Sequence, residues 1–134
     1  MGVVFRARHV ILNKHVAVKV LRKANDEAAW KRFVQEAQTA SAVTHDNVVG
    51  ISDFGVISGH AYLVMELMEG QTLTDVINAG PAEPLRVCRI GAQIARGLQA
   101  VHDKGVVHRD LKPDNIFLIE REGKQDVVKI VDFG

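Results

Sequence analysis

The first half of the chain is patterned like an antiparallel sheet. Two runs of β-branched and apolar residues, 3–8 and 16–21, flank a short polar connection, which is the arrangement of a β-hairpin. Two further runs, 48–56 and 60–68, flank a Ser-Gly dipeptide in the same way. The pattern therefore predicts four strands arranged as two hairpins.

Between the two hairpins the apolar spacing changes to that of a helix. Apolar positions within residues 28–40 recur at helical intervals, and either Asn25 or Asp26 is suited to cap the first turn. Further along the chain, residues 72–78 predict a short helix. Residues 84–104 predict a long and largely buried one.

The end of the chain returns to strand character. Residues 116–119 and 127–131 are β-branched runs joined by a polar connection in which Gly123 can take the turn. The predicted fold class is α+β. Residues 1–69 form an antiparallel sheet with one helix, and residues 70–134 begin a helical part. A cleft between two such parts is a common place for a ligand.

Composition narrows the class of protein without identifying it. The 134 residues carry 17 Lys or Arg against 16 Asp or Glu, and 47% are apolar. This near-neutral balance gives no reason to expect nucleic acid or a membrane surface as a partner. The single Cys88 cannot form an internal disulfide, so a reducing compartment such as the cytoplasm is expected. Arg6 and Arg8 stand where a secretory leader would be apolar, and no run approaches the roughly 18 residues of a spanning helix.

The strongest chemical signal lies in residues 108–115, which read His-Arg-Asp-Leu-Lys-Pro-Asp-Asn between the long helix and a strand. Asp110 and Asn115 are close enough in sequence for a short loop to direct both side chains into one space. A carboxylate there can orient a hydroxyl group and accept its proton, and a carboxamide oxygen can bind a hard cation. Lys112 adds a mobile positive charge suited to phosphate oxygens.

Two weaker signals lie outside this loop. Lys19 ends a Val-Ala-Val-Lys strand pattern, and Glu36 follows it on the predicted helix. Asp132 begins an Asp-Phe-Gly triplet after the last strand. A strand lysine is usually solvated, and an Asp-x-Gly triplet is most often a turn. The two signals gain weight only in combination with residues 108–115.

Together these segments resemble protein kinases of the eukaryotic, or Hanks, type, and the compact loops resemble those of bacterial serine/threonine kinases. The resemblance implies a kinase fold with a sheet-rich N-lobe and the start of a helical C-lobe. It implies that Asp110 is the catalytic base and that Lys112 contacts phosphate. It further implies that Lys19 holds the α- and β-phosphates of ATP while Glu36 fixes the lysine ammonium group.

The same resemblance implies the ligand-binding residues. Asn115 and Asp132 would bind Mg²⁺ that bridges the ATP phosphates. The nucleotide would be bound by Gly2, Val4, Ala17, Lys19, Met65, Glu66, Met68 and Phe117. Taken singly, Val4, Ala17 and Phe117 are more readily explained as core packing. His108 and Phe133 are expected to pack rather than to take part in the chemistry.

Lys112, two residues after Asp110, is typical of serine/threonine kinases, so the expected acceptor is a Ser or Thr hydroxyl of a protein. Arg109 resembles the arginine that meets a phosphorylated activation-loop residue. The resemblance covers the whole chain but only about half of a kinase domain. The first strand and most of the glycine loop are expected to be missing before Gly2, and the activation segment after Gly134.

Two functions follow from this reading. The first is a partial catalytic domain of an ATP-dependent protein kinase, whose isolated chain is expected to have little activity. The second is a noncatalytic kinase-like module that binds nucleotide or a partner protein.

Overall fold

The computed structural model describes residues 2–21 and 27–132, apart from the side chain of Ala29. The chain divides into two compact units. Unit 1 comprises Met1–Ala42 and Gly50–Leu67, and unit 2 comprises Val43–Val49 and Met68–Gly134. The expected helix caps Asn25 and Asp26, and the expected Phe133 and Gly134, lie outside the described residues.

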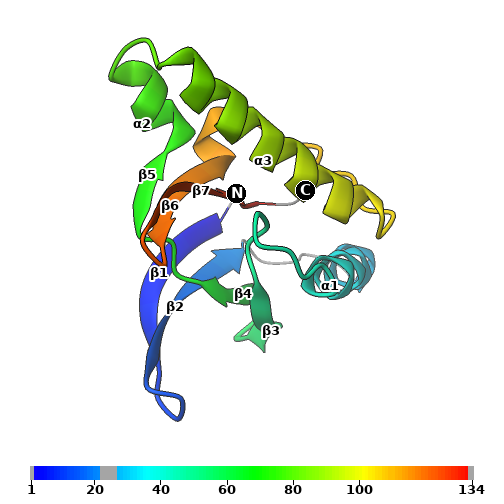
Figure 1. Cartoon of the computed structure of the whole chain (residues 1–134). Helices are drawn as coiled ribbons and strands as arrows, with labels where there is room; N and C mark the ends of the chain where they lie inside the picture. Colours follow the sequence, from blue (N-terminus) through cyan, green and yellow to red (C-terminus); the bar gives the residue numbers. More distant parts are fainter. Residues whose placement is uncertain (1, 22–26, 133–134) are drawn as a thin grey trace. The chain divides into compact units, whose positions relative to one another are not determined.

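Unit 1 is a four-stranded antiparallel sheet with one helix (Figure 1). Its strands lie in the order β1-β2-β4-β3. The elements are β1 (Gly2–His9), β2 (Lys14–Leu21), α1 (Glu27–Ser41), β3 (Ile51–Ile57) and β4 (His60–Glu66). The two predicted hairpins are therefore present, and they pair with each other through β2 and β4.

Strand register decides which side chains of unit 1 share a face. In β2, Ala17 lies opposite Arg6 of β1 and Met65 of β4, and Lys19 lies opposite Val4 and Leu63. Directly opposed residues of antiparallel strands project from the same side of a sheet, and alternate residues of one strand do so too. Ala17, Lys19 and their partners therefore occupy one face.

Helix α1 packs on this same face. The ring of Phe33 stacks on that of Trp30 with centroids 5.5 Å apart and meets Phe54 of β3 edge-on at 6.4 Å. Phe54 lies opposite Leu63, which in turn lies opposite Lys19. The aromatic contact thus places α1 over the side of the sheet from which Lys19 projects.

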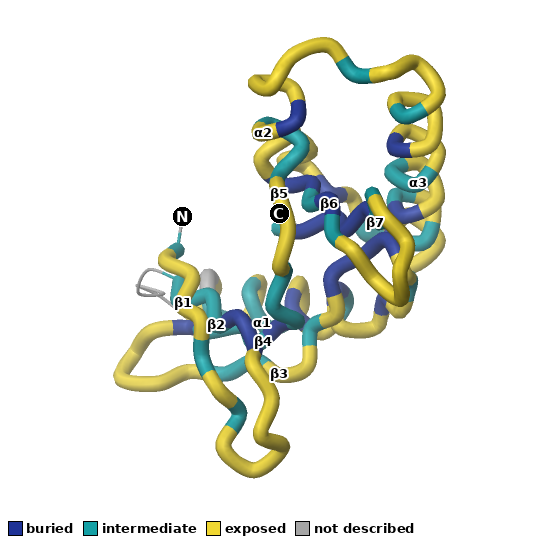
Figure 2. Tube along the Cα trace, turned by 60° about the vertical axis from the view of Figure 1, so that its left-hand side comes forward, coloured by how far each residue is buried: buried dark blue, intermediate teal, exposed yellow. Residues whose placement is uncertain are grey.

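Unit 2 is a three-stranded sheet covered by helices, in the strand order β5-β6-β7. Its elements are β5 (Gly70–Thr72), α2 (Leu73–Asn78), α3 (Pro84–His102), the 3₁₀ turn η1 (Pro113–Asn115), β6 (Ile116–Arg121) and β7 (Lys124–Ile130). One face of the sheet forms the core with the two helices (Figure 2), through Val76, Ile90, Ile116, Leu118, Val128 and Ile130.

The predicted strand over 48–56 is wrong at its start. Strand β3 begins only at Ile51, and Val48 instead forms a parallel bridge with Ile130 beside β7 in unit 2. The Val49 N–H donates to Ile130 O at 2.9 Å, and the Ile130 N–H donates to Asn47 O at 2.9 Å. Val48 is only 2% exposed, so burial in the unit 2 core overrides the local pattern.

The sequence pattern missed one strand and overstated the burial of one helix. Strand β5 was not predicted, because three residues give too short a pattern. The predicted long helix is buried along one stripe only, at Ile90, Gly97 and Val101, whereas Leu85 and Val87 are each 53% exposed. Helix α2 begins at Leu73, one residue after the predicted start, because Thr72 is its N-cap and forms a reciprocal capping box with Asp75.

Candidate active site

The loop after α3 brings three of the predicted site residues together in unit 2. Asn115 donates from Nδ2 to the Asp110 carbonyl oxygen at 2.9 Å and to Asp110 Oδ2 at 3.1 Å. Lys112 Nζ lies 2.9 Å from the same Asp110 Oδ2. Asp110 and Lys112 are exposed to solvent, while Asn115 is buried. A buried carboxamide thus holds an exposed carboxylate beside an exposed ammonium group.

The charges in this cluster stabilise one another. The hydrogen bond and charge of Lys112, with help from Asn115 and His108, hold the pKa of Asp110 below its ordinary value. The pKa of Lys112 is raised, chiefly by Asp110 and further by Asp114 and Asp132. Asp110 is consequently ionised, and Lys112 charged, throughout the neutral range.

Buried contacts anchor the chain on both sides of this cluster. His108 is 2% exposed, and its Nε2 lies 2.8 Å from Val131 O. The Val131 N–H donates to Asn115 O at 2.9 Å. These bonds fix the residue before Asp132 to the segment that carries Asn115. The expectation that His108 packs missed this hydrogen bond, for which the sequence offers no signal.

A second contact that the sequence did not predict supports η1. Thr74 of α2 donates from Oγ1 to Asp114 Oδ1 at 2.6 Å.

Arg109 and Asp132 both have left-handed backbones, with φ of 63° and 58°. This conformation is uncommon for residues other than glycine, and it concentrates local strain at the two ends of the site.

The donor set of unit 2 fits a magnesium ion bound together with phosphates. The two hydrogen bonds of Asn115 Nδ2 to Asp110 orient the carboxamide, and the described residues offer Oδ1 no donor. Asn115 can therefore present an oxygen to a hard cation, as Asp132 can with its carboxylate. No group of three or more His, Cys, Asp or Glu side chains within 2–21 and 27–132 forms an all-protein metal cage. Magnesium commonly binds through one or two protein oxygens with water and phosphate completing its shell.

In unit 1, register gathers the predicted nucleotide-binding residues on one face. Val4 and Lys19 oppose each other, as do Ala17 and Met65, and Gly2 lies two residues before Val4. Ala17 and Met65 are buried, whereas Val4 is 55% exposed. A Cβ on Gly2 would collide with the carbonyl oxygen of Val20, so a side chain there would disturb the β1–β2 pairing.

The remaining predicted residues are placed individually. Glu66 ends β4; its N–H donates to Gly50 O at 3.0 Å, and its Oε1 accepts from the Gly50 N–H at 2.7 Å. Glu36 lies on an exposed part of α1. In unit 2, Met68 is half-buried, and half-buried Phe117 lies opposite Thr72, on the sheet face away from the core.

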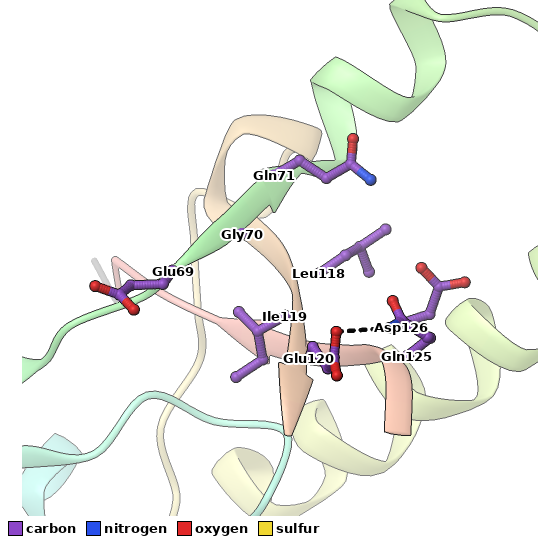
Figure 3. Close-up of a pocket in the computed structure, with 8 residues that line it drawn as sticks. All are labelled: Glu69, Gly70, Gln71, Leu118, Ile119, Glu120, Gln125 and Asp126. Atoms are coloured by element: carbon purple, nitrogen blue, oxygen red, sulfur yellow. Dashed lines mark hydrogen bonds between the residues drawn. The ribbon is translucent and has the colours of Figure 1, made fainter. Parts of the chain in front are cut away.

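A separate hollow lies beside β5, β6 and β7, and no residue predicted for the site lines it (Figure 3). Its lining includes Glu120 and Asp126. Glu120 accepts from Gln125 at 2.7 Å, and Asp126 accepts two hydrogen bonds from Arg86 at 2.8 and 2.9 Å. The negative charge of these carboxylates makes the hollow unsuited to ATP phosphates.

Known proteins are similar to this chain along its whole length. The family model described as protein kinase domain matches residues 1–134, and the chain belongs to the protein kinase family. It is 45% identical over 136 residues to the serine/threonine-protein kinase pkn2 of Myxococcus xanthus, which covers 100% of this chain and 16% of that protein. It is 42% identical over 137 residues to the serine/threonine-protein kinase PrkC of Bacillus subtilis, covering 100% and 20%.

Solved structures confirm the predicted fold class. The kinase domain of PknI from Mycobacterium tuberculosis matches with a TM-score of 0.83 and 28% identity, over 99% of this chain and 54% of that one. A double mutant of the same domain matches with a TM-score of 0.85. The chain therefore has a protein kinase fold, and the resemblance to bacterial Hanks-type kinases is confirmed.

The matches also define the extent of the chain. It spans between 16% and 25% of the first three curated relatives and about half of the PknI kinase domain. Kinases of this family in general use ATP and a divalent cation. Across the described ranges, no helix has both the length and the apolar character needed to cross a membrane.

Proposed function

We propose that this chain is part of the catalytic domain of a serine/threonine protein kinase that transfers the γ-phosphoryl group of ATP to Ser or Thr hydroxyls of proteins. Residues 1–69 would serve as the N-lobe and residues 70–134 as the beginning of the C-lobe. The use of ATP also favours a cytoplasmic location for this segment. Family membership and the serine/threonine kinases among its relatives support the reaction class.

The observation that carries the proposal is the contact of Asp110 with both Asn115 and Lys112. In the transfer, the acceptor hydroxyl oxygen forms a bond to the γ-phosphorus as the bond from that phosphorus to the β–γ bridging oxygen breaks. ADP leaves with the electron pair of the broken bond. Asp110 orients the hydroxyl and accepts its proton, and Lys112 offsets negative charge on the transferred group.

Asn115 and Asp132 would hold magnesium, which supplies charge neutralisation between the nucleotide phosphates. The contacts of their neighbours support this role. His108 and Asn115 both bond to Val131, so the residue before Asp132 is fixed from two sides. Preorganised ligands lose less entropy on binding, which is the advantage of such an anchor.

Lys19 would hold the α- and β-phosphates, and Glu36 would orient its ammonium group. The support comes from unit 1 alone: α1 packs through Phe33 and Phe54 on the sheet face from which Lys19 projects. A glutamate on that helix is on the correct side of the sheet to reach the lysine. The exposed Val4 and the buried Ala17 flank Lys19 on the same face and would contact the adenine with Phe117.

The test compares Asp110→Asn with the unmodified protein, using the polypeptide that carries this segment. Phosphate transfer from labelled ATP to a generic basic protein is measured beside nucleotide affinity. We expect the rate to fall by roughly 10²–10⁴-fold, with nucleotide affinity largely retained. Asp103→Asn is the matched control, because Asp103 is an exposed carboxylate at the end of α3. The rate of phosphate transfer by this variant should equal that of the unmodified protein.

Equal rates for the unmodified protein and Asp110→Asn would reject Asp110 as the base. If nucleotide binds but neither protein transfers phosphate, the chain would instead be the noncatalytic module named as the alternative.

A further inference from the structure

The connection between β1 and β2 has an unusual composition for a hairpin turn. Turns of this kind usually contain Gly, Asn or Asp. The sequence pattern predicted a polar connection at residues 12–15, but the turn lies at residues 10–13. It begins with Val10, Ile11 and Leu12, which are 86%, 86% and 60% exposed. Three adjacent aliphatic side chains therefore face solvent at the end of a narrow ribbon, where they bury nothing within the unit.

The polar groups of the turn form hydrogen bonds with one another, which hold the backbone of residues 8–13 in place. The Arg8 guanidinium donates to Asn13 Oδ1 from both Nε and Nη2. The Leu12 N–H donates to His9 Nδ1 at 3.2 Å. Asn13 has the left-handed backbone that closes the turn, with φ of 51°. Hydrogen bonds thus order the connection while its aliphatic side chains remain outside.

The ribbon also extends beyond the rest of the sheet (Figure 1). Pairing of β1 with β2 continues outward to His9 opposite Lys14, whereas pairing of β2 with β4 begins only at Val16. Residues 8–15 therefore form a two-stranded projection without a third strand. A two-stranded ribbon gains little stability by itself, so an extension of this kind is not explained by the fold.

Charge around the projection is of one sign. The first 25 residues of the chain carry six Lys or Arg and no Asp or Glu, although the whole chain is balanced at +1. Near the turn, Arg6 and Arg8 project from one face of the ribbon and Lys14 from the other, and all three are exposed. The expectation of no membrane contact was based on the whole-chain average, which conceals this asymmetry.

We propose that the β1–β2 turn inserts Val10, Ile11 and Leu12 into the interface of an anionic phospholipid bilayer while Arg6, Arg8 and Lys14 bind its headgroups. A strand advances about 3.3 Å per residue, so the cations nearest the turn lie within about 10 Å of its tip. That distance matches the roughly 5–10 Å to which interfacial segments bury their apolar side chains. Cations at the surface of an anionic leaflet are attracted to it within a Debye length.

The geometry favours lipid over a protein partner. Three side chains at a ribbon tip cover far less than the roughly 800 Å² per partner of a stable protein interface. The turn also offers neither the aromatic side chains nor the concave surface of a typical protein contact. An apolar point surrounded by cations is instead complementary to a fluid apolar layer beneath anionic headgroups.

A second hairpin of the same sheet provides a matched control. Between β3 and β4, Val56 and Ile57 are 48% and 64% exposed, but residues 51–66 contain no Lys or Arg. The register places this turn at the opposite end of the sheet from Val10–Leu12. It thus has comparable aliphatic exposure without the surrounding cations.

The experiment is flotation of the whole chain with vesicles of phosphatidylcholine alone, or with about one-third phosphatidylglycerol, at low and high salt. We expect flotation with the anionic vesicles only, weakened by salt. A triple variant, Val10→Ser, Ile11→Ser and Leu12→Ser, should reduce the bound fraction at least tenfold. The pair Val56→Ser and Ile57→Ser should leave it unchanged.

Charge is tested separately with Lys14→Gln, which should weaken vesicle binding about threefold or more, against Lys31→Gln on α1, which should not. Circular dichroism of each variant confirms that the fold is retained. Equal flotation with neutral and anionic vesicles, or equal effects of the two hairpin variants, would overturn the proposal. Self-association without vesicles that the triple variant abolishes would assign the turn to contact with a second copy. None of these measurements depends on kinase activity.

Discussion

Asn47 and Gln93, 46 residues apart in sequence, are joined by a hydrogen bond of 3.0 Å from Asn47 Nδ2 to Gln93 Oε1. The same Asn47 nitrogen donates to Val128 O at 2.9 Å, and the same Gln93 oxygen accepts from the Val128 N–H at 3.1 Å. Gln93 Nε2 also donates to Asp126 O at 2.8 Å. Two side-chain amides thus connect the 43–49 segment, helix α3 and strand β7.

Removing the Asn47 side chain should destabilise unit 2. Asn47 is 6% exposed, so Asn47→Ala leaves the Val128 carbonyl without a buried donor. We expect a loss of about 1–3 kcal/mol in the free energy of unfolding, measured by urea denaturation. Asp46→Ala, at the exposed neighbouring position, should change it by no more than about 0.5 kcal/mol. Equal losses for the two variants would show that the amide contacts contribute nothing.

Two glycines of α3 should respond to alanine in opposite ways. At Gly97, a Cβ would lie 2.8 Å from Ile130 Cδ1 and 3.0 Å from Asn47 O, so Gly97→Ala should cost about 1–3 kcal/mol through overpacking. At Gly91 a Cβ would meet nothing within 4 Å. Gly91→Ala should therefore stabilise the helix by about 0.5–1 kcal/mol. Urea unfolding of both variants checks this, and a gain at Gly97 would refute the close packing.

The pKa of Asp110 should rise when Lys112 loses its charge. Lys112 is the main cause of the lowered pKa, so Lys112→Met should return it towards the ordinary value of 3.8. A carboxylate with a lowered pKa contributes stability above its unfolded pKa and loses it as pH falls through the folded value. Asp110 should therefore remain ionised to a lower pH in the wild type than in Lys112→Met. Carboxyl NMR titration of Asp110 measures the shift, and Lys104→Met should leave it unchanged.

Lys19→Met should weaken nucleotide binding if Lys19 contacts the phosphates. Charge-assisted hydrogen bonds typically contribute about 1.5–3 kcal/mol, which corresponds to roughly 10–150-fold in the dissociation constant of ATP. Lys31→Met changes an exposed lysine of the same unit that pairs with Glu27, and should have no effect. Calorimetric titration with ATP and magnesium makes the comparison. Equal affinity in Lys19→Met and wild type would remove Lys19 from the site.

The sequence predicted the features that depend on local pattern. Alternation identified both hairpins of unit 1, helical spacing identified α1 and α3, and the 108–115 motif correctly placed Asp110 beside Asn115. Errors arose where distant residues decide the structure. Val48 continues an apolar run in the sequence, yet its bridge to Ile130 depends on a strand that lies 82 residues later. The bond from His108 to Val131 escaped prediction for the same reason.

The placement of Val43–Val49 within unit 2 also has a topological consequence. Because this segment interrupts unit 1 in the sequence, the chain passes between the units three times, at 42/43, 49/50 and 67/68. A protease that cut once near Leu67 would leave fragments that share unit 2. The hydrogen bonds of the Asn47 side chain and the bridge between Val48 and Ile130 would hold the two fragments together without a covalent link. Co-elution of such a nicked pair in native buffer, and its separation only in denaturant, would be the mark of this interleaved topology.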